Sequence, residues 1–165
     1  FSRLAPEDCR YVRPGAAAQI FAGPQAIGTI GEVHPRVLLN YDLKQPAFFF
    51  EIDIDRLFPL VPEVRRASAP PKFPFVERDL TVILDTAIEA GEILGALAES
   101  GQKLVESLRL LDVYTGPPIP QDKKSVSVRI TYRSDTGTLE DAVVSRVHRQ
   151  LSDGVVARFG ATLPA

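Results

Sequence analysis

The sequence predicts an α+β protein made of two antiparallel units, and three observations carry this prediction. Residues 125–133 alternate strictly between an apolar face and a face of hydroxyl and arginine side chains, as in a strand that buries one side. The apolar face holds Val126, Val128, Ile130 and Tyr132. Five prolines within residues 59–74 exclude a helix or a central strand there and indicate an extended connection. The segments after this connection follow the order βαββαβ.

In the first unit, residues 1–70, the pattern predicts a mostly antiparallel fragment. Residues 17–21 and 26–33 are expected strands around a Gly-Pro turn, and Pro35 is well placed to open a short helix through about Leu43. Residues 47–55 form the next expected strand, and residues 55–58 a single helical turn. In that strand one face would hold Phe48, Phe50, Ile52 and Ile54, while Phe49 would be buried or covered by a neighbour. The first ten residues have no evident partner, so we expect this fragment to be incomplete.

The second unit, residues 71–165, begins with an expected strand over 79–84 and a short helix over 90–100. The strand would bury Leu80, Val82 and Leu84, and the helix Ile93, Leu94 and Leu97. Gly101 is suited to end that helix in the left-handed conformation. A second strand is expected over 105–114, and Gly116-Pro117-Pro118 would interrupt it before the central strand.

A long helix is expected to open at Thr138, with Asp141 completing a capping box, and to stop at Gly160. Its apolar stripe would be Leu139, Val143, Val147 and Leu151. Residues 161–163 would form a short closing strand. This order is the split βαβ of a ferredoxin-like sandwich, which buries one face of a four-stranded sheet under two helices and leaves the other face open.

Composition sets loose bounds on function. With 45% hydrophobic and 24% charged residues the chain is ordinary globular material, and a net charge of −2 gives no bulk attraction for nucleic acid. A single Cys9 excludes an internal disulfide and argues against a zinc site, which favours a reducing, cytoplasmic location. No apolar run reaches the roughly 20 residues that span a bilayer. The chain contains no Met, so Phe1 is not expected to be a translation start, and we expect a piece of a longer polypeptide.

Several motifs in order along nearly the whole chain resemble the C-terminal end of the bacterial phenylalanyl-tRNA synthetase β subunit. Residues 28–35 resemble the family's Gly-x-Ile-Gly-x-x-His-Pro, residues 73–80 its Pro-x-x-x-Arg-Asp, and residues 111–116 its Phe-Asp-Val-Tyr-x-Gly. Residues 11–18 stand where the family has a His-Pro-Gly-Arg-Ser-Ala-like turn, but Arg13 and Ala16 replace the usual His and Arg.

The resemblance implies that residues 1–70 are the C-terminal part of an inactive, catalytic-like class II synthetase core, and that residues 71–165 are a ferredoxin-fold anticodon-binding domain. The partners it implies are the anticodon stem-loop of tRNA(Phe) and the synthetase α subunit in an α2β2 assembly, with neither membrane nor DNA. The holoenzyme would be a phenylalanine–tRNA ligase that uses ATP and Mg²⁺ in the α subunit. No catalytic residue, metal site or cofactor is expected in this segment.

Charge is unevenly distributed along the second unit. Residues 123–158 hold seven basic side chains against four acidic ones, whereas residues 85–112 hold six acidic against two basic. Arginine and lysine supply most affinity for phosphates, and single-stranded loops are also held by stacking on aromatic or guanidinium planes. The expected tRNA contacts are Arg78, Tyr114, Lys123, Lys124, Arg129 and Arg133. A solvated sheet face is the alternative, and Tyr132 is expected in the core rather than in a stacking role.

Other residues carry weaker signals. His34 is expected to satisfy backbone groups at a strand end, His148 to reach solvent or RNA, and Asp53 with Asp55 to be solvent-exposed rather than to bind Mg²⁺. Two other functions stay open for a βαββαβ domain. An amino-acid-binding regulatory module would need glycines in its first strand–helix loop, where Gly91 stands alone; an acylphosphatase-type enzyme would need an Asn, and Asn40 lies outside the domain.

Overall fold

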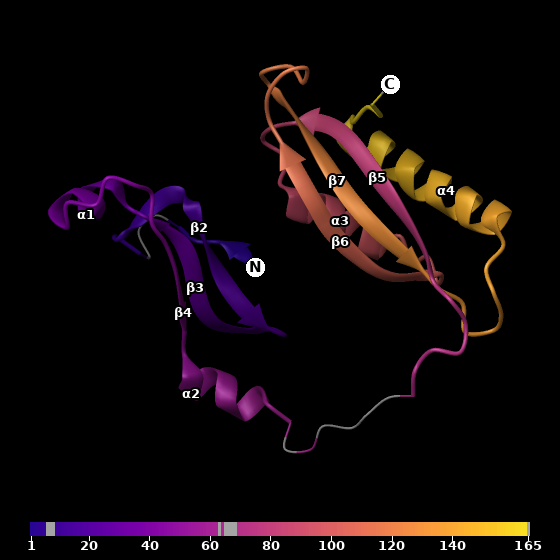
Figure 1. The fold of residues 1–165 in the computed structure, drawn as a ribbon, viewed down its shortest axis with the longest axis horizontal. Helices are drawn as coiled ribbons and strands as arrows, with labels where there is room; N and C mark the ends of the chain where they lie inside the picture. The colour runs from indigo at the N-terminus through magenta and orange to yellow at the C-terminus, as the bar shows by residue number, and fades with distance from the viewer. Residues whose placement is uncertain (6–8, 63, 65–68, 165) are drawn as a thin grey trace. The chain divides into compact units, whose positions relative to one another are not determined.

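The computed structural model describes residues 1–5, 9–62, 64 and 69–164, and the chain divides into two compact units, Phe1–Ser68 and Ala69–Ala165 (Figure 1). Each unit has its own antiparallel sheet and its own buried cluster. Of the expected connection, Arg65, Arg66 and Ser68 lie outside the described residues, as does Ala165 at the end of the chain.

The first unit is a sheet in which the strands follow each other in sequence order. Its elements are β1 (Ser2–Arg3), β2 (Val12–Ala22), β3 (Gln25–Val33), α1 (Pro35–Asn40), β4 (Phe48–Ile52), α2 (Ile54–Leu57) and the 3₁₀ turn η1 (Phe58–Leu60). A Cβ on Gly28 would lie 2.1 Å from the carbonyl oxygen of Glu51, so this glycine lets β3 and β4 approach closely. The helix at Pro35 is confirmed, but it ends at Asn40 rather than at Leu43, because Asp42 takes a positive φ of 53° and turns the chain.

One expectation for this unit is wrong, and another is confirmed. The first residues do have a partner, since β1 pairs with β2 and Leu4 joins Cys9 and Val12 in a buried cluster. Phe49 packs against that cluster, as expected, whereas Phe48 and Phe50 on the other face are 75% and 72% exposed. They line an open apolar groove over β2, β3 and β4. Alternation along three consecutive phenylalanines allows either Phe49 or the pair Phe48 and Phe50 to face inward. The position of the Leu4 cluster decides that Phe49 does.

The second unit contains β5 (Val76–Asp85), β6 (Val105–Tyr114) and β7 (Lys123–Tyr132) in the order β5-β7-β6, with α3 (Ala90–Glu99) and α4 (Asp141–Phe159) covering one face (Figure 1). All four apolar residues of the central strand are buried, which confirms the alternation read from the sequence. They pack with Leu80, Val82, Leu84, Ile93, Leu97, Val144, Val147, Leu151 and Val155. Gly101 and Gly160 follow α3 and α4 with φ of 66° and 60°, as expected.

The expected capping box at Thr138 is wrong, because α4 begins three residues later at Asp141. Glu140 precedes the helix in extended conformation, and its side chain makes no capping hydrogen bond. Leu139 reaches the core from the extended segment before the helix. This placement turns Val144 rather than Val143 into the fully buried position of the first turns.

The expected closing strand is a single bridge between Ile83 and Thr162, with two backbone hydrogen bonds of 2.8 Å. Continuing this antiparallel ladder would oppose Pro164 to Thr81, and Pro164 has no N–H to donate. In the other direction the partner would be Gly160, which ends α4 in the left-handed conformation. The chain therefore has room for one hydrogen-bonded pair at this edge.

Candidate RNA interface on the open sheet face

The side chains that alternate with the core on β5, β6 and β7 form the open face of the second unit. Directly opposed residues of antiparallel strands carry their side chains on the same face, so the register defines rows across the sheet. The central row joins Asp79, Arg129 and Arg109, from β5, β7 and β6 respectively. The rows beside it are Glu77–Thr131–Ser107 and Thr81–Ser127–Asp112. These three rows are polar, and they bring acidic and basic groups together.

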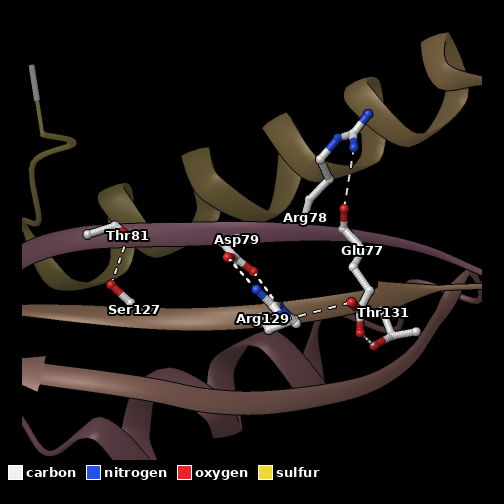
Figure 2. Close-up of polar contacts among 7 residues, drawn as sticks. All are labelled: Glu77, Arg78, Asp79, Thr81, Ser127, Arg129 and Thr131. Carbon is white, nitrogen blue, oxygen red and sulfur yellow. Dashed lines mark hydrogen bonds and ion pairs between the residues drawn. The ribbon is translucent and has the colours of Figure 1, made fainter.

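Arg129 is held by two carboxylates (Figure 2). Its Nε and Nη2 donate to Oδ1 and Oδ2 of Asp79 at 2.8 and 2.9 Å, and its Nη1 lies 3.9 Å from Oε2 of Glu77. The hydrogen bond from Arg129 holds the pKa of Asp79 below its usual range, and the same bond raises the pKa of the guanidinium. The Arg129 side chain remains 37% exposed. It is thus fixed in orientation and still accessible from solvent.

The neighbouring rows are internally hydrogen-bonded as well. The Thr81 and Ser127 hydroxyls lie 2.9 Å apart, and the Thr131 hydroxyl donates to Oε1 of Glu77 at 3.4 Å (Figure 2). These cross-strand bonds fix the side chains around Arg129.

Arg133 directly follows the central strand, and its side chain makes its contacts within the second unit. Its Nε donates to Oε1 of Glu106 at 2.8 Å and its Nη1 to the carbonyl of Phe73 at 2.7 Å, while the guanidinium lies 5.3 Å from the ring centre of Phe75. With 18% of its side chain exposed, Arg133 ties the incoming segment to β7.

Two of the expected contact residues lie away from the open face. Arg78 points toward α4 (Figure 2). Its Nη2 pairs with the carboxylate of Asp141, the first residue of that helix. Lys124 is opposite Leu84, on the helix-covered side, and its Nζ donates to the carbonyl of Thr86 at 3.0 Å. The structure therefore does not bring these two cations together with Arg129.

Lys123 and Tyr114 do belong to the open face, at its far end. Lys123 is opposite Asp85, and Tyr114 is opposite Ser125. The Tyr114 hydroxyl donates to the carbonyl of Pro117 at 2.9 Å, while the residue stays 46% exposed. Tyr132, by contrast, is fully buried, as expected.

Sequence reasoning missed Arg109, because it lies in a segment counted as acidic. It is exposed and directly opposite Arg129, and within the described residues no ion pair involves it. The alternation of side chains along residues 105–114 could have placed Arg109 on the open face. It could not have placed Arg109 next to Arg129 without the pairing of β6 with β7.

The minor candidates have structural roles. His34 caps α1, where its Nδ1 accepts from the backbone N–H of Arg36 at 3.1 Å, which confirms the expectation. Asp53 caps α2 through the N–H of Arg56. His148 shares a hydrogen bond with the Tyr132 hydroxyl. Among the described residues no group of three or more His, Cys, Asp or Glu side chains could hold a metal ion, and no described helix is long and apolar enough to cross a bilayer.

The fold and the face define a class: a ferredoxin-like sandwich with one sheet face left uncovered by helices. The sequence profile of the ferredoxin-fold anticodon-binding domain matches residues 71–164, and the chain belongs to this family. The profile of the phenylalanyl-tRNA synthetase β chain CLM domain matches residues 2–54.

Curated relatives agree with both matches. The chain is 40% identical over 150 residues to the phenylalanine–tRNA ligase β subunit of Clostridium acetobutylicum, an alignment that covers 91% of this chain and 19% of the relative. It is 36% identical over 153 residues to that of Syntrophotalea carbinolica, with 93% and 19% covered, and 35% identical over 171 residues to that of Moorella thermoacetica, with 99% and 21% covered. The chain thus spans about a fifth of the length of these relatives. The resemblance seen in the motifs is confirmed.

Proposed function

We propose that the second unit binds the anticodon stem-loop of tRNA(Phe) through the open face of its sheet, with Arg109 and Arg129 at the centre. The observation that carries this proposal is the central row, in which two arginines from neighbouring strands stand side by side on an uncovered sheet of an anticodon-binding family. Arg109 supplies the charge that phosphates need. Tyr114 and Lys123 extend the same face, whereas Arg78, Lys124 and Arg133 support it through contacts within the domain.

The wider role rests on the names of the relatives. We infer that this segment positions tRNA for aminoacylation with phenylalanine, that ATP and Mg²⁺ act in the α subunit of an α2β2 holoenzyme, and that the assembly is cytoplasmic. Residues 1–70 would be the end of the catalytic-like core, and residues 71–165 the anticodon-binding domain. No chemical step is assigned to this segment.

Binding across a salt series tests the role of the open face. The 165-residue chain would be titrated with a synthetic RNA hairpin that carries an unpaired loop, and the slope of log affinity against log salt would be compared between variants. Arg109→Ala is expected to weaken binding and to reduce the slope by about 0.7, the contribution of one phosphate contact to single-stranded nucleic acid.

Arg146→Ala is the matched control, because Arg146 is also exposed but belongs to α4 on the covered side. Equal effects of the two substitutions, or binding that is insensitive to salt, would contradict the proposal.

A further inference from the structure

The contact between Asp79 and Arg129 has a geometry that goes beyond charge balance. Asp79 bonds the Nε and Nη2 edge of the guanidinium with both of its oxygens, so the plane of the group is fixed. Hydrogen bonds to a guanidinium lie in its plane and leave its two flat faces unoccupied. Because Arg129 is more than a third exposed, part of this group is open to solvent.

The same contact lowers the value of Arg129 as a phosphate ligand. The carboxylate of Asp79 compensates its charge, and that of Glu77 stands 3.9 Å from Nη1. A phosphate approaching Arg129 therefore meets two negative groups. An uncharged base meets no such repulsion, and unpaired bases stack on guanidinium planes.

We propose that Asp79 is a positioning residue that holds Arg129 as a flat platform for one unpaired base, while Arg109 beside it takes the phosphate backbone. This inference rests on the proposed RNA binding and names the chemistry of its central contact. It divides two adjacent arginines between two tasks, because Arg129 has a carboxylate partner and Arg109 has none among the described side chains.

The effect of Asp79→Asn on RNA affinity distinguishes a role in charge from a role in positioning, because the two roles predict changes in opposite directions. Asp79→Asn removes a negative charge from the face, so simple attraction of RNA predicts tighter binding. If Asp79 orders Arg129, the variant leaves a long side chain to be immobilised on binding, and affinity for the looped hairpin falls by about two- to tenfold. Glu77→Gln makes the same change in charge on the same strand without breaking a bidentate contact, and it is expected to bind as tightly as wild type or more tightly.

The experiment compares these variants in the full 165-residue chain, with the looped RNA hairpin as probe and an uninterrupted RNA duplex as control. In addition, Asp79→Asn is measured in the background of Arg129→Ala, where it is expected to have no further weakening effect. The loss caused by Asp79→Asn should appear with the hairpin and leave the salt slope unchanged. Arg129→Lys, which keeps the charge but not the planar fork, should show the same loss even if Asp79→Asn folds poorly.

The outcomes distinguish a failure of the positioning role of Asp79 from a failure of RNA binding by the open face. Hairpin binding that Asp79→Asn leaves equal or tighter would overturn the positioning role and leave RNA binding intact. An equal loss in the wild-type and Arg129→Ala backgrounds would also overturn it, because Asp79 would then act through something else. A wild-type chain that fails to bind the hairpin would overturn the proposed function and this inference with it.

Discussion

Replacing Tyr132 by phenylalanine removes one hydroxyl from the core of the second unit and leaves the ring. Tyr132 is fully buried, and its hydroxyl shares a 2.9 Å hydrogen bond with Nδ1 of His148, whose ring it meets edge-on with centroids 6.1 Å apart. Loss of this bond at pH 8 is expected to lower the free energy of unfolding by about 1 kcal/mol. His148 is partly exposed, so water can satisfy its nitrogen in the variant and keep the cost near this value.

The pH dependence of this difference makes the prediction specific. Burial raises the pKa of Tyr132 to about 12 from its ordinary value of 10.0. The unfolded chain therefore loses this proton first, and the contribution of Tyr132 to stability is complete below pH 10 and is lost as the pH rises through 12. Two pKa units correspond to at most about 2.7 kcal/mol, and screening by water near His148 reduces this to about 1–2 kcal/mol.

The variant lacks this titration, so the advantage of the wild type over Tyr132→Phe should shrink above pH 10 and vanish near pH 11. Urea unfolding at pH 8, 10 and 11 measures the difference in free energy of unfolding between the two proteins. The helical circular dichroism signal in the far ultraviolet monitors the unfolding. This signal reports mainly on the second unit, because α3 and α4 contain 10 and 19 residues. All other groups are the same in the two proteins, so their effects cancel in the difference. A difference that stays constant from pH 8 to 11 would refute the reasoning.

Three further predictions test the architecture. Phe49→Ala should destabilise the first unit by about 2–3 kcal/mol in urea unfolding, whereas the exposed Phe50→Ser should change it by less than about 0.5 kcal/mol; equal costs would contradict the assigned parity. Gly154→Ala, inside α4 with open space around its Cβ position, should raise the free energy of unfolding by about 0.5–1 kcal/mol. Gly160→Ala, at a φ of 60°, should lower it by about 1 kcal/mol, and thermal unfolding of both variants measures the two changes. Pro164→Ala restores an N–H opposite β5 and should add one exchange-protected amide at residue 164 in hydrogen-exchange measurements, and an unprotected amide there would contradict the explanation of the short closing strand.

The second unit was largely predictable because its signals are local and agree with each other. The alternation through Ile130 has period two and one buried face, so a shift of one residue would expose the whole apolar set. Gly101 and Gly160 end helices for a reason that needs no tertiary context, the positive φ that follows a helix. The start of α4 was predicted wrongly, because the local capping rule at Thr138 competes with burial of Leu139, and burial decides.

The first unit was less predictable, because its core is small and assembled from distant pieces. Which side of the strand at Phe49 faces inward depends on Leu4, which follows a two-residue strand that carries no periodic signal of its own. Propensity and periodicity cannot resolve a choice between parities in a run of identical side chains. The contact with a segment some forty-five positions away resolves it.

The pairing of charges on the open face could not be predicted from the sequence either, because it depends on which strands are neighbours. Along the sequence the second unit divides into an acidic stretch and a basic one, and this polarity suggested a positive surface. In space β7 lies between β5 and β6, so the basic strand is flanked by carboxylates: Arg129 pairs with Asp79 and Arg133 with Glu106. A net positive patch of sequence thus becomes a row of ion pairs. Arg109, for which the described residues provide no ion pair, lies in the stretch counted as acidic. Counting charge along the chain is therefore a poor guide to binding residues on such a sheet. A better guide is to set aside each cation that a carboxylate of a neighbouring strand pairs with, and to consider the cations that are left.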